Sequence, residues 1–218
     1  MQQRITPLFL ALGLATLLTA PAHAQMWNFP DYMVPGMRGS PTSWVSADFG
    51  RGLNEASGEE NAFGAAYGRT GEAISFMIGA GIITGDFDDE FTFGAAVGGD
   101  FMEGDGVTLG VQGGFGWVSP GPLTLIRIPV GLTVRSETEM EDGGIVIPWV
   151  MPRLNFSRWS GGGDSDSELD LGISGGVTMT LSSGVGFHAA LDYLLVEGDD
   201  PLQFGLGIHY LLGSSGGN

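Results

Sequence analysis

The side chains of this sequence that are best suited to acid–base chemistry are two histidines and an aspartate near its C-terminal end. His188 and Asp192 share one face of an alternating stretch, and His209 lies in the next stretch. An imidazole can take up or release a proton near neutral pH, and a carboxylate can orient it, so these three residues are candidate catalytic residues. Because no serine stands at a recognisable spacing from either histidine, the sequence supplies no evident nucleophile. A hydrolase with an inward His/Asp site is therefore kept as an alternative.

Other charged residues occupy the same kind of face, the one that carries small and polar side chains. An isolated charge in an apolar interior is costly, so such charges are found in pairs. We therefore favour a structural network of ion pairs inside the fold over a catalytic site. The predicted network comprises Arg69, Asp100, Arg127, Arg135, Arg153, Asp170 and Asp192.

Two acidic stretches, residues 85–90 and 161–168, place oxygen ligands at alternate positions, as calcium loops do. The weak candidate ligands are Asp86, Asp88, Asp164 and Asp166. Neither stretch matches the complete EF-hand or nonapeptide pattern, so we expect acidic surface loops and neither a metal nor another cofactor.

The elements that would position these residues are strands. About ten stretches alternate between bulky apolar and small or polar residues, and a period of two indicates extended backbone. Pro148 and Pro152 predict a bulge or break in the seventh strand, because proline removes a ladder donor. The predicted strands are Ser43–Gly52, Ala62–Arg69, Ala73–Thr84, Glu90–Met102, Val107–Val118, Thr124–Arg135, Ile145–Trp159, Glu168–Ser182, Val185–Val196 and Gln203–Leu212.

The composition of the two strand faces indicates which one points outward. The second face is mostly Gly, Ala, Ser and Thr, and the chain has no lysine, so it would make a poorly solvated exterior in water. Bulky side chains facing lipid around a small and polar interior explain both faces. We therefore predict an all-β fold, a closed antiparallel up-and-down transmembrane β-barrel, with ten strands preferred and eight as the alternative. Aromatic residues near strand ends suggest interfacial girdles: Trp117, Trp149, Trp159, Tyr193 and Tyr210.

The connections between the predicted strands give a second test, because membrane barrels alternate short periplasmic turns with longer outer loops. Most of the predicted connections alternate in this way. Ser119–Leu123 is shorter and Ser136–Gly144 longer than this rule predicts, so either the strand count slips there or the barrel has an atypical loop.

The last strand resembles the C-terminal assembly signal of bacterial outer-membrane β-barrel proteins, with a polar residue, a glycine and then apolar and aromatic positions. The matching residues are Gln203, Gly205, Ile208 and Tyr210. Met1–Ala24 has a positive start, an apolar core and a small-residue cleavage site, which predict an export signal. The resemblance implies an outer-membrane location, contact with outer-membrane lipid and lipopolysaccharide, and handling by the barrel assembly machinery and periplasmic chaperones. It also brings the hydrolase alternative, since some outer-membrane barrels are enzymes.

Composition and length set further bounds. The 218 residues carry a net charge of -17, which argues against nucleic-acid binding, and the absence of cysteine excludes disulfides and thiolate chemistry. The expected organisation is a signal peptide at 1–24, an irregular segment at 25–42, the barrel at 43–212 and a short tail at 213–218.

These observations predict a non-enzymatic outer-membrane barrel with a structural or envelope role or limited passage of small solutes. A barrel with so few strands fills its lumen with side chains, so a general porin is not expected. Besides the hydrolase, a secreted lipocalin-like barrel that binds a lipophilic ligand is a second alternative. The oligomeric state is not predicted.

Overall fold

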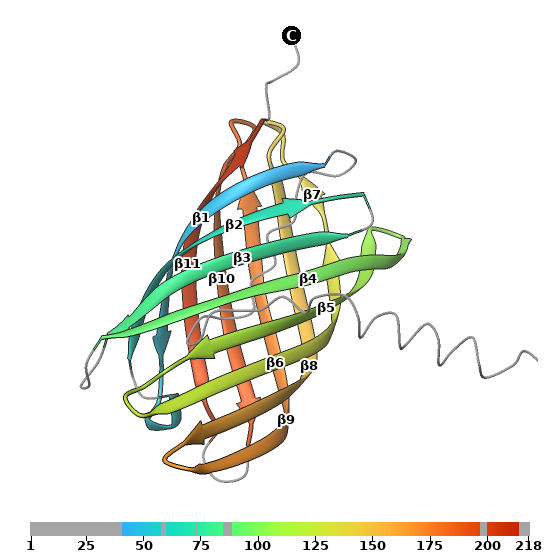
Figure 1. The fold of residues 1–218 in the computed structure, drawn as a ribbon. Helices are drawn as coiled ribbons and strands as arrows, with labels where there is room; N and C mark the ends of the chain where they lie inside the picture. The colour runs from blue at the N-terminus through green and yellow to red at the C-terminus, as the bar shows by residue number, and fades with distance from the viewer. Residues whose placement is uncertain (1–40, 58–59, 73, 85–88, 197–199, 214–218) are drawn as a thin grey trace, which may run out of the picture.

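The computed structural model describes residues 41–57, 60–72, 74–84, 89–196 and 200–213. These residues form a barrel of long, tilted strands (Figure 1). Among them, no helix is long and apolar enough to cross a membrane. The elements are β1 (Thr42–Gly52), the short 3-10 helix η1 (Glu55–Ser57), β2 (Asn61–Thr70), β3 (Ser75–Thr84), β4 (Glu90–Gly104), β5 (Val107–Val118), β6 (Leu123–Ser136), β7 (Thr138–Glu139), β8 (Ile145–Gly161), β9 (Asp164–Thr180), β10 (Val185–Leu195) and β11 (Leu202–Leu212).

The barrel closes through antiparallel pairs between neighbours in the chain. The first and last strands join along their whole length, from Ser43 opposite Leu212 to Gly52 opposite Gln203. β6 pairs directly with β8, so the two-residue β7 lies outside the ten-strand cylinder and adds only to the start of β8. The prediction of a closed ten-strand up-and-down barrel is thus confirmed, and the eight-strand alternative is wrong.

The atypical middle loop is real and does not reflect a miscounted strand. Residues 137–144 leave β6, pair briefly with β8 as β7, and turn through Gly143, whose φ is 79°. The connection from β5 to β6 is short, with Leu123 N donating to Pro120 O at 3.0 Å. The strand count therefore holds through both irregular connections.

The acidic stretch at residues 161–168 is part of the β8–β9 hairpin, where a surface loop was predicted. β8 runs on to Gly161 and β9 starts at Asp164, with paired residues up to Gly161 opposite Asp164. The turn uses Gly162 and Gly163, whose φ angles of 63° and 98° favour glycine. On the β9 side the hairpin extends beyond its neighbour, since the β9–β10 ladder ends at Leu171 opposite Leu195, whereas β8 stays paired with β6 up to Gly161 opposite Leu123.

The prolines interrupt ladders without breaking strands. β8 is continuous through Pro148 and Pro152, and both prolines face outward, so the predicted bulge or break there is wrong. The observed irregularity in register lies in β4, between Asp100 and Met102. Because proline has no N–H, it removes one hydrogen bond to one neighbouring strand. The strand itself can continue.

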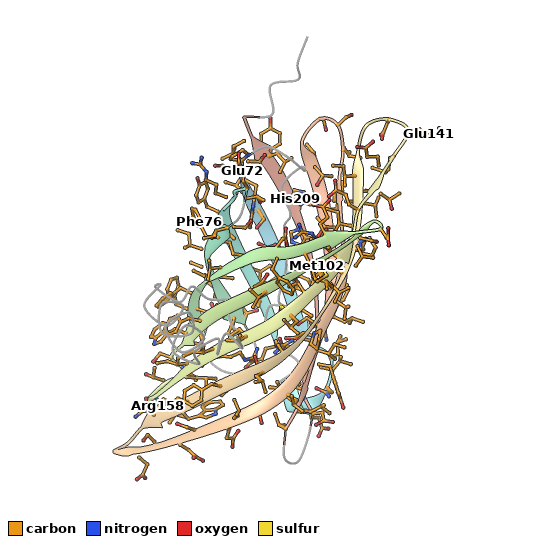
Figure 2. All side chains as sticks on the ribbon, turned by 90° about the vertical axis from the view of Figure 1, so that its right-hand side faces the viewer. Glu72, Phe76, Met102, Glu141, Arg158 and His209 are labelled. Carbon is orange, nitrogen blue, oxygen red and sulfur yellow. The ribbon has the colours of Figure 1, made fainter. Side chains whose placement is uncertain are left out.

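Bulky apolar side chains cover the outside of the barrel, as predicted. The side chain of Phe93 is 40% exposed and that of Ile208 is 55% exposed, so among the described residues no polar layer covers them. Figure 2 shows Phe76 projecting away from the barrel wall. Trp149 departs from the expected girdle, because its side chain is 6% exposed and points inward.

The interior contains more large apolar side chains than predicted. One buried cluster joins Trp149, Met151, Leu125, Val118, Ile83, Ala62 and Ala190. A second joins Trp44, Leu211, Met77, Ala66 and Ala96. Leu211, the one bulky residue on the polar face of the last strand, is fully buried in this second cluster. Glycines on the neighbouring strands make room for these large groups.

Candidate functional site in the barrel lumen

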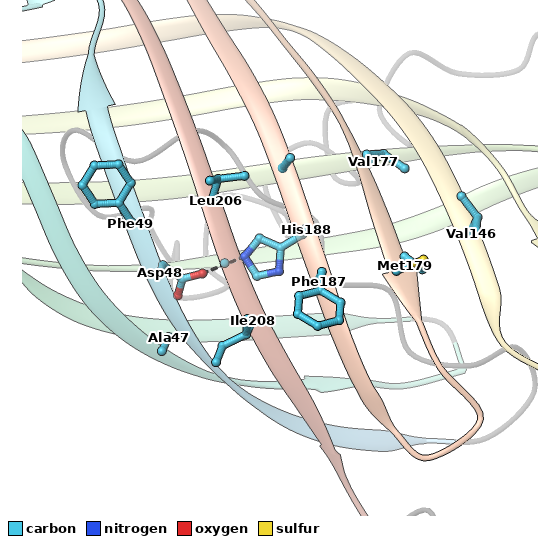
Figure 3. Close-up of a pocket in the computed structure, with 12 residues that line it drawn as sticks. Ala47, Asp48, Phe49, Val146, Val177, Met179, Phe187, His188, Leu206 and Ile208 are labelled. Atoms are coloured by element: carbon cyan, nitrogen blue, oxygen red, sulfur yellow. Dashed lines mark hydrogen bonds and ion pairs between the residues drawn. The ribbon is translucent and has the colours of Figure 1, made fainter.

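Four strands bring a chain of hydrogen-bonding side chains together inside the barrel. His188 Nε2 lies 2.7 Å from Asp48 Oδ1, joining β10 to β1 across 140 residues of sequence (Figure 3). His188 Nδ1 lies 3.4 Å from His209 Nδ1 on β11, and His209 Nε2 lies 2.9 Å from Thr180 Oγ1 on β9. All four side chains are more than nine-tenths buried.

If both histidines are neutral, the hydrogen-bond partners in this series of side chains allow one consistent set of proton positions. Asp48 is an acceptor, so His188 donates through Nε2–H and its Nδ1 then accepts from His209 Nδ1–H. His209 Nε2 is left as an acceptor for the Thr180 hydroxyl. The two rings are nearly parallel, at 16°, with their centroids 5.6 Å apart. Every heteroatom of the two imidazoles thereby has a partner.

Glycine residues make the space that the histidines occupy. A Cβ at position 207 would overlap His188 Nε2 and Asp48 Oδ1, and one at position 186 would overlap His209 Nε2. Gly207 sits opposite both Asp48 and His188 in the strand register, so it lies directly against their hydrogen bond. The small-residue face of the strands is thus complementary in shape to the polar network.

A second polar cluster is centred on Arg153 of β8. Its Nη2 lies 2.5 Å from Asp192 Oδ1, its Nη1 donates to Ser174 Oγ, and its Nε donates to Asn155 Oδ1 at 3.2 Å. Ser174 in turn donates to Asp192 Oδ1 at 3.0 Å. A Cβ at Gly172 would lie 3.1 Å from Arg153 Cζ, so this glycine leaves room for the guanidinium. Asp192 is therefore the counter-ion of Arg153.

The remaining members of the predicted network separate into three environments. Arg135 and Asp100 form an ion pair at 2.6 Å, with side chains 18% and 39% exposed. Arg127 is buried and interacts electrostatically with the half-buried Asp170. Arg69 was predicted to face inward, which is wrong, because it is exposed and shares the outward parity of Phe63 and Tyr67.

Two of the four weak metal candidates lie among the residues that the structure describes. Asp164 and Asp166 are exposed on the β8–β9 hairpin, and Asp166 Oδ1 accepts from Ser167 N at 2.8 Å. Asp86 and Asp88 lie outside the described residues. Within the described ranges, no group of three or more His, Cys, Asp or Glu side chains is placed to hold a metal ion.

Sequence reasoning missed Asp48 and its partner Ser46, whose Oγ donates to Asp48 Oδ2 at 2.6 Å. The signal was present, because Trp44, Ser46 and Asp48 alternate with Val45, Ala47 and Phe49 and so share the inward face. The sequence does not show that Asp48 meets His188, because this contact depends on the strand order β1, β11, β10.

The assembly-signal residues lie on the strand that completes the cylinder. Gln203 and Gly205 of β11 face inward and are buried, while Ile208 and Tyr210 face outward, 55% and 48% exposed. All four are paired with residues of β1, so the strand predicted to carry the assembly signal is also the closing strand.

The catalytic candidates are buried, and they do not form the His188–Asp192 pair that the sequence suggested. Asp48, not Asp192, supports His188, and the serine near this carboxylate bonds to it and not to an imidazole. The Thr180 hydroxyl contacts His209, but His209 is 2% and Thr180 5% exposed, so a substrate has no direct access to either group. A nucleophile must reach its substrate, and this arrangement instead satisfies buried polar groups.

A closed antiparallel cylinder with an apolar exterior and a packed, partly charged interior defines a transmembrane β-barrel of the outer-membrane type. No family model matches the sequence, and no curated protein matches it.

Solved structures of similar shape include the N-terminal β-barrel domain of Pseudomonas aeruginosa OprF (TM-score 0.39, 11% identity, 79% of this chain and 100% of that one). They also include the beta domain of the Bordetella autotransporter BrkA (0.44, 13%, 79% and 100%) and the Yersinia pestis attachment invasion locus protein Ail (0.41, 8%, 79% and 97%). These likenesses are distant, with identities of 8–13%.

Proposed function

We propose that this protein is a non-enzymatic, integral outer-membrane β-barrel that serves the envelope structurally and does not act as a general pore. The observation that carries the proposal is the filled lumen. Leu125, Met151 and Leu211 are among the largest side chains with under 2% exposure, and all three point inward. A barrel of this strand number has an interior that side chains can fill.

The lumen is closed by two kinds of contact that support one another. The two apolar clusters exclude water, while the Arg153–Asp192 pair and the Asp48–His188 bond connect strands that are far apart in sequence. In a low-dielectric interior a satisfied polar network is rigid, and removing one partner is costly. The interior therefore supports a structural role, with passage limited at most to small solutes.

The apolar exterior supports residence in a lipid bilayer. Exposed large side chains occur on every strand of the cylinder, including Phe76, Phe91, Leu132, Leu154 and Leu191. A soluble protein that bound a lipophilic ligand inside its barrel would carry these groups inward. This arrangement argues against the secreted lipocalin-like alternative.

The same proposal includes export and assembly. Met1–Ala24 would direct export, periplasmic chaperones would carry the unfolded chain, and the barrel assembly machinery would recognise β11. Outer-membrane lipid and lipopolysaccharide would surround the finished barrel. The pairing of β11 with β1 supports this order, since the recognised strand is needed to close the cylinder.

The test is conductance of the purified full-length protein in planar lipid bilayers. We expect insertion, seen as heat-modifiable gel mobility of the reconstituted sample, without sustained conductance steps. The double variant Trp149→Ala, Met151→Ala removes two lumen-filling side chains and should raise conductance above the wild type. Large, stable conductance steps in the wild-type protein would contradict the proposal.

A further inference from the structure

An apolar groove of about 660 Å³ crosses the outer wall of the barrel, over β1, β11, β10, β9 and β8. It follows the direction of the inter-strand hydrogen bonds, between two rows of outward side chains (Figure 3). One row follows the cross-strand pairs Ala47, Ile208, Phe187, Met179 and Val146. The other follows Phe49, Leu206, Ala189 and Val177.

Two alanines leave space in the groove, because their side chains are small. Ala189 stands between Leu206 and Val177 in one row, and Ala47 ends the other row beside Ile208. Asp48 and His188 also border the groove, but their polar ends bond to each other on the lumen side of the wall. The surface offered to a ligand is therefore hydrocarbon.

The position of the groove indicates how a ligand would lie. Val146 is near the start of β8 and Met179 near the end of β9, whereas Ala47 and Phe49 lie midway along β1. The groove thus runs from one rim of the barrel to mid-wall. This rim carries the tight turns after β2, β4 and β9, so it is the periplasmic one.

We propose that the groove holds one acyl chain of a phospholipid from the periplasmic leaflet. The inference rests on the proposed membrane location, because only then does hydrocarbon surround the wall. The groove has about four times the roughly 150 Å³ that admits a benzene molecule, so a long chain segment fits. Lipid tails are as apolar as the wall, so the chain is held by close packing rather than by the hydrophobic effect.

The test is lipid retention by the full-length protein after reconstitution with palmitoyl-oleoyl-phosphatidylethanolamine and extraction into mild detergent. Native mass spectrometry then gives the fraction of barrels that keep one lipid. Ala189→Leu and Ala189→Trp fill the groove, while Ala80→Leu adds the same bulk to an exposed, outward position on β3. We expect both Ala189 variants to lower the retained fraction by about threefold or more, Trp more than Leu, with Ala80→Leu unchanged.

Equal retention in all four proteins would overturn the proposal. It would also be overturned by a wild-type dimer that Ala189→Trp abolishes, because a second copy would then occupy the groove. Heat-modifiable gel mobility is measured on every sample, to separate failure of lipid binding in the groove from failure of the proposed membrane location. Loss of lipid retention with normal mobility concerns the groove alone, whereas a wild-type protein that never enters the bilayer contradicts the membrane location.

Discussion

The indole of Trp44 on β1 occupies the space that a side chain at position 68 on β2 would need. Trp44 and Gly68 are opposite each other in the register, and a Cβ at 68 would overlap the indole atoms Cζ2 and Cε2. Trp44 is 3% exposed and belongs to the inner cluster with Leu211 and Met77. One glycine thus permits the largest side chain of that cluster to lie inside the barrel.

Gly68→Ala is therefore expected to destabilise the barrel by about 1–3 kcal/mol, because the indole must move within a packed interior. Gly113→Ala is the matched control, since its Cβ would meet other atoms only at 3.8 Å or beyond. Urea unfolding of the refolded proteins in vesicles, followed by gel mobility, measures both. Equal stability of the two variants would show that Trp44 does not pack as described.

The Asp48–His188 hydrogen bond gives a second prediction. Asp48→Ala leaves a buried imidazole N–H without its acceptor, which should cost about 1–3 kcal/mol, whereas Asp48→Asn retains an acceptor oxygen and should cost less. A double-mutant cycle of Asp48→Ala with His188→Ala should give a coupling of about 0.5–3 kcal/mol. Strict additivity would mean that the two side chains do not interact in the bilayer.

Substitutions in the buried pair of Arg153 and Asp192 should lower the free energy of unfolding more than those at Asp48. Removing either charge alone leaves the other buried, which should cost about 3–5 kcal/mol for Arg153→Met or Asp192→Leu. The double variant should be much less destabilised than the sum of the two. The comparable pair Arg135–Asp100 is partly exposed and should contribute about 1 kcal/mol or less in the same unfolding experiment.

Depth in the bilayer provides a fourth prediction, on one strand. Leu191 near the middle of β10 and Leu195 at its end are 50% and 49% exposed, so the two sites differ mainly in depth. Arginine on the lipid face should cost about 2–4 kcal/mol at Leu191 and about 0–1 kcal/mol at Leu195. Similar costs at both positions would show that this face does not lie against hydrocarbon.

The alternation of residues was sufficient to predict the fold, because a period of two assigns each side chain to a face without knowledge of its neighbours. It placed Phe93 and Ile208 outside and His188 inside, as the structure has them. It also contained the inward position of Trp149, which was assigned to the girdle by its place near a strand end instead. Arg69 shows the same error, since its parity alone gives the outward face.

Pairings across the barrel could not be predicted in this way. Arg153 meets Asp192 only because β9 lies between their strands in register, and Asp48 meets His188 across the seam that closes the cylinder. The β8–β9 hairpin was missed for a different reason. Asp164 and Asp166 belong to the start of β9, which lacks the apolar alternation that marks the other strands.

The central claim is that the bulky side chains face lipid and the polar ones face a filled lumen. The chain has no cysteine, so single cysteines carrying a nitroxide label can be placed at will, at Phe93, Ile128 and Ile208 outside and at Gln112 inside. In phospholipid vesicles we expect oxygen dissolved in the bilayer to relax the three outer labels strongly, and a water-soluble nickel chelate to leave them unaffected. The label at Gln112 should respond weakly to both. Strong nickel relaxation at Phe93 and Ile208, or shielding of both from oxygen, would contradict the account.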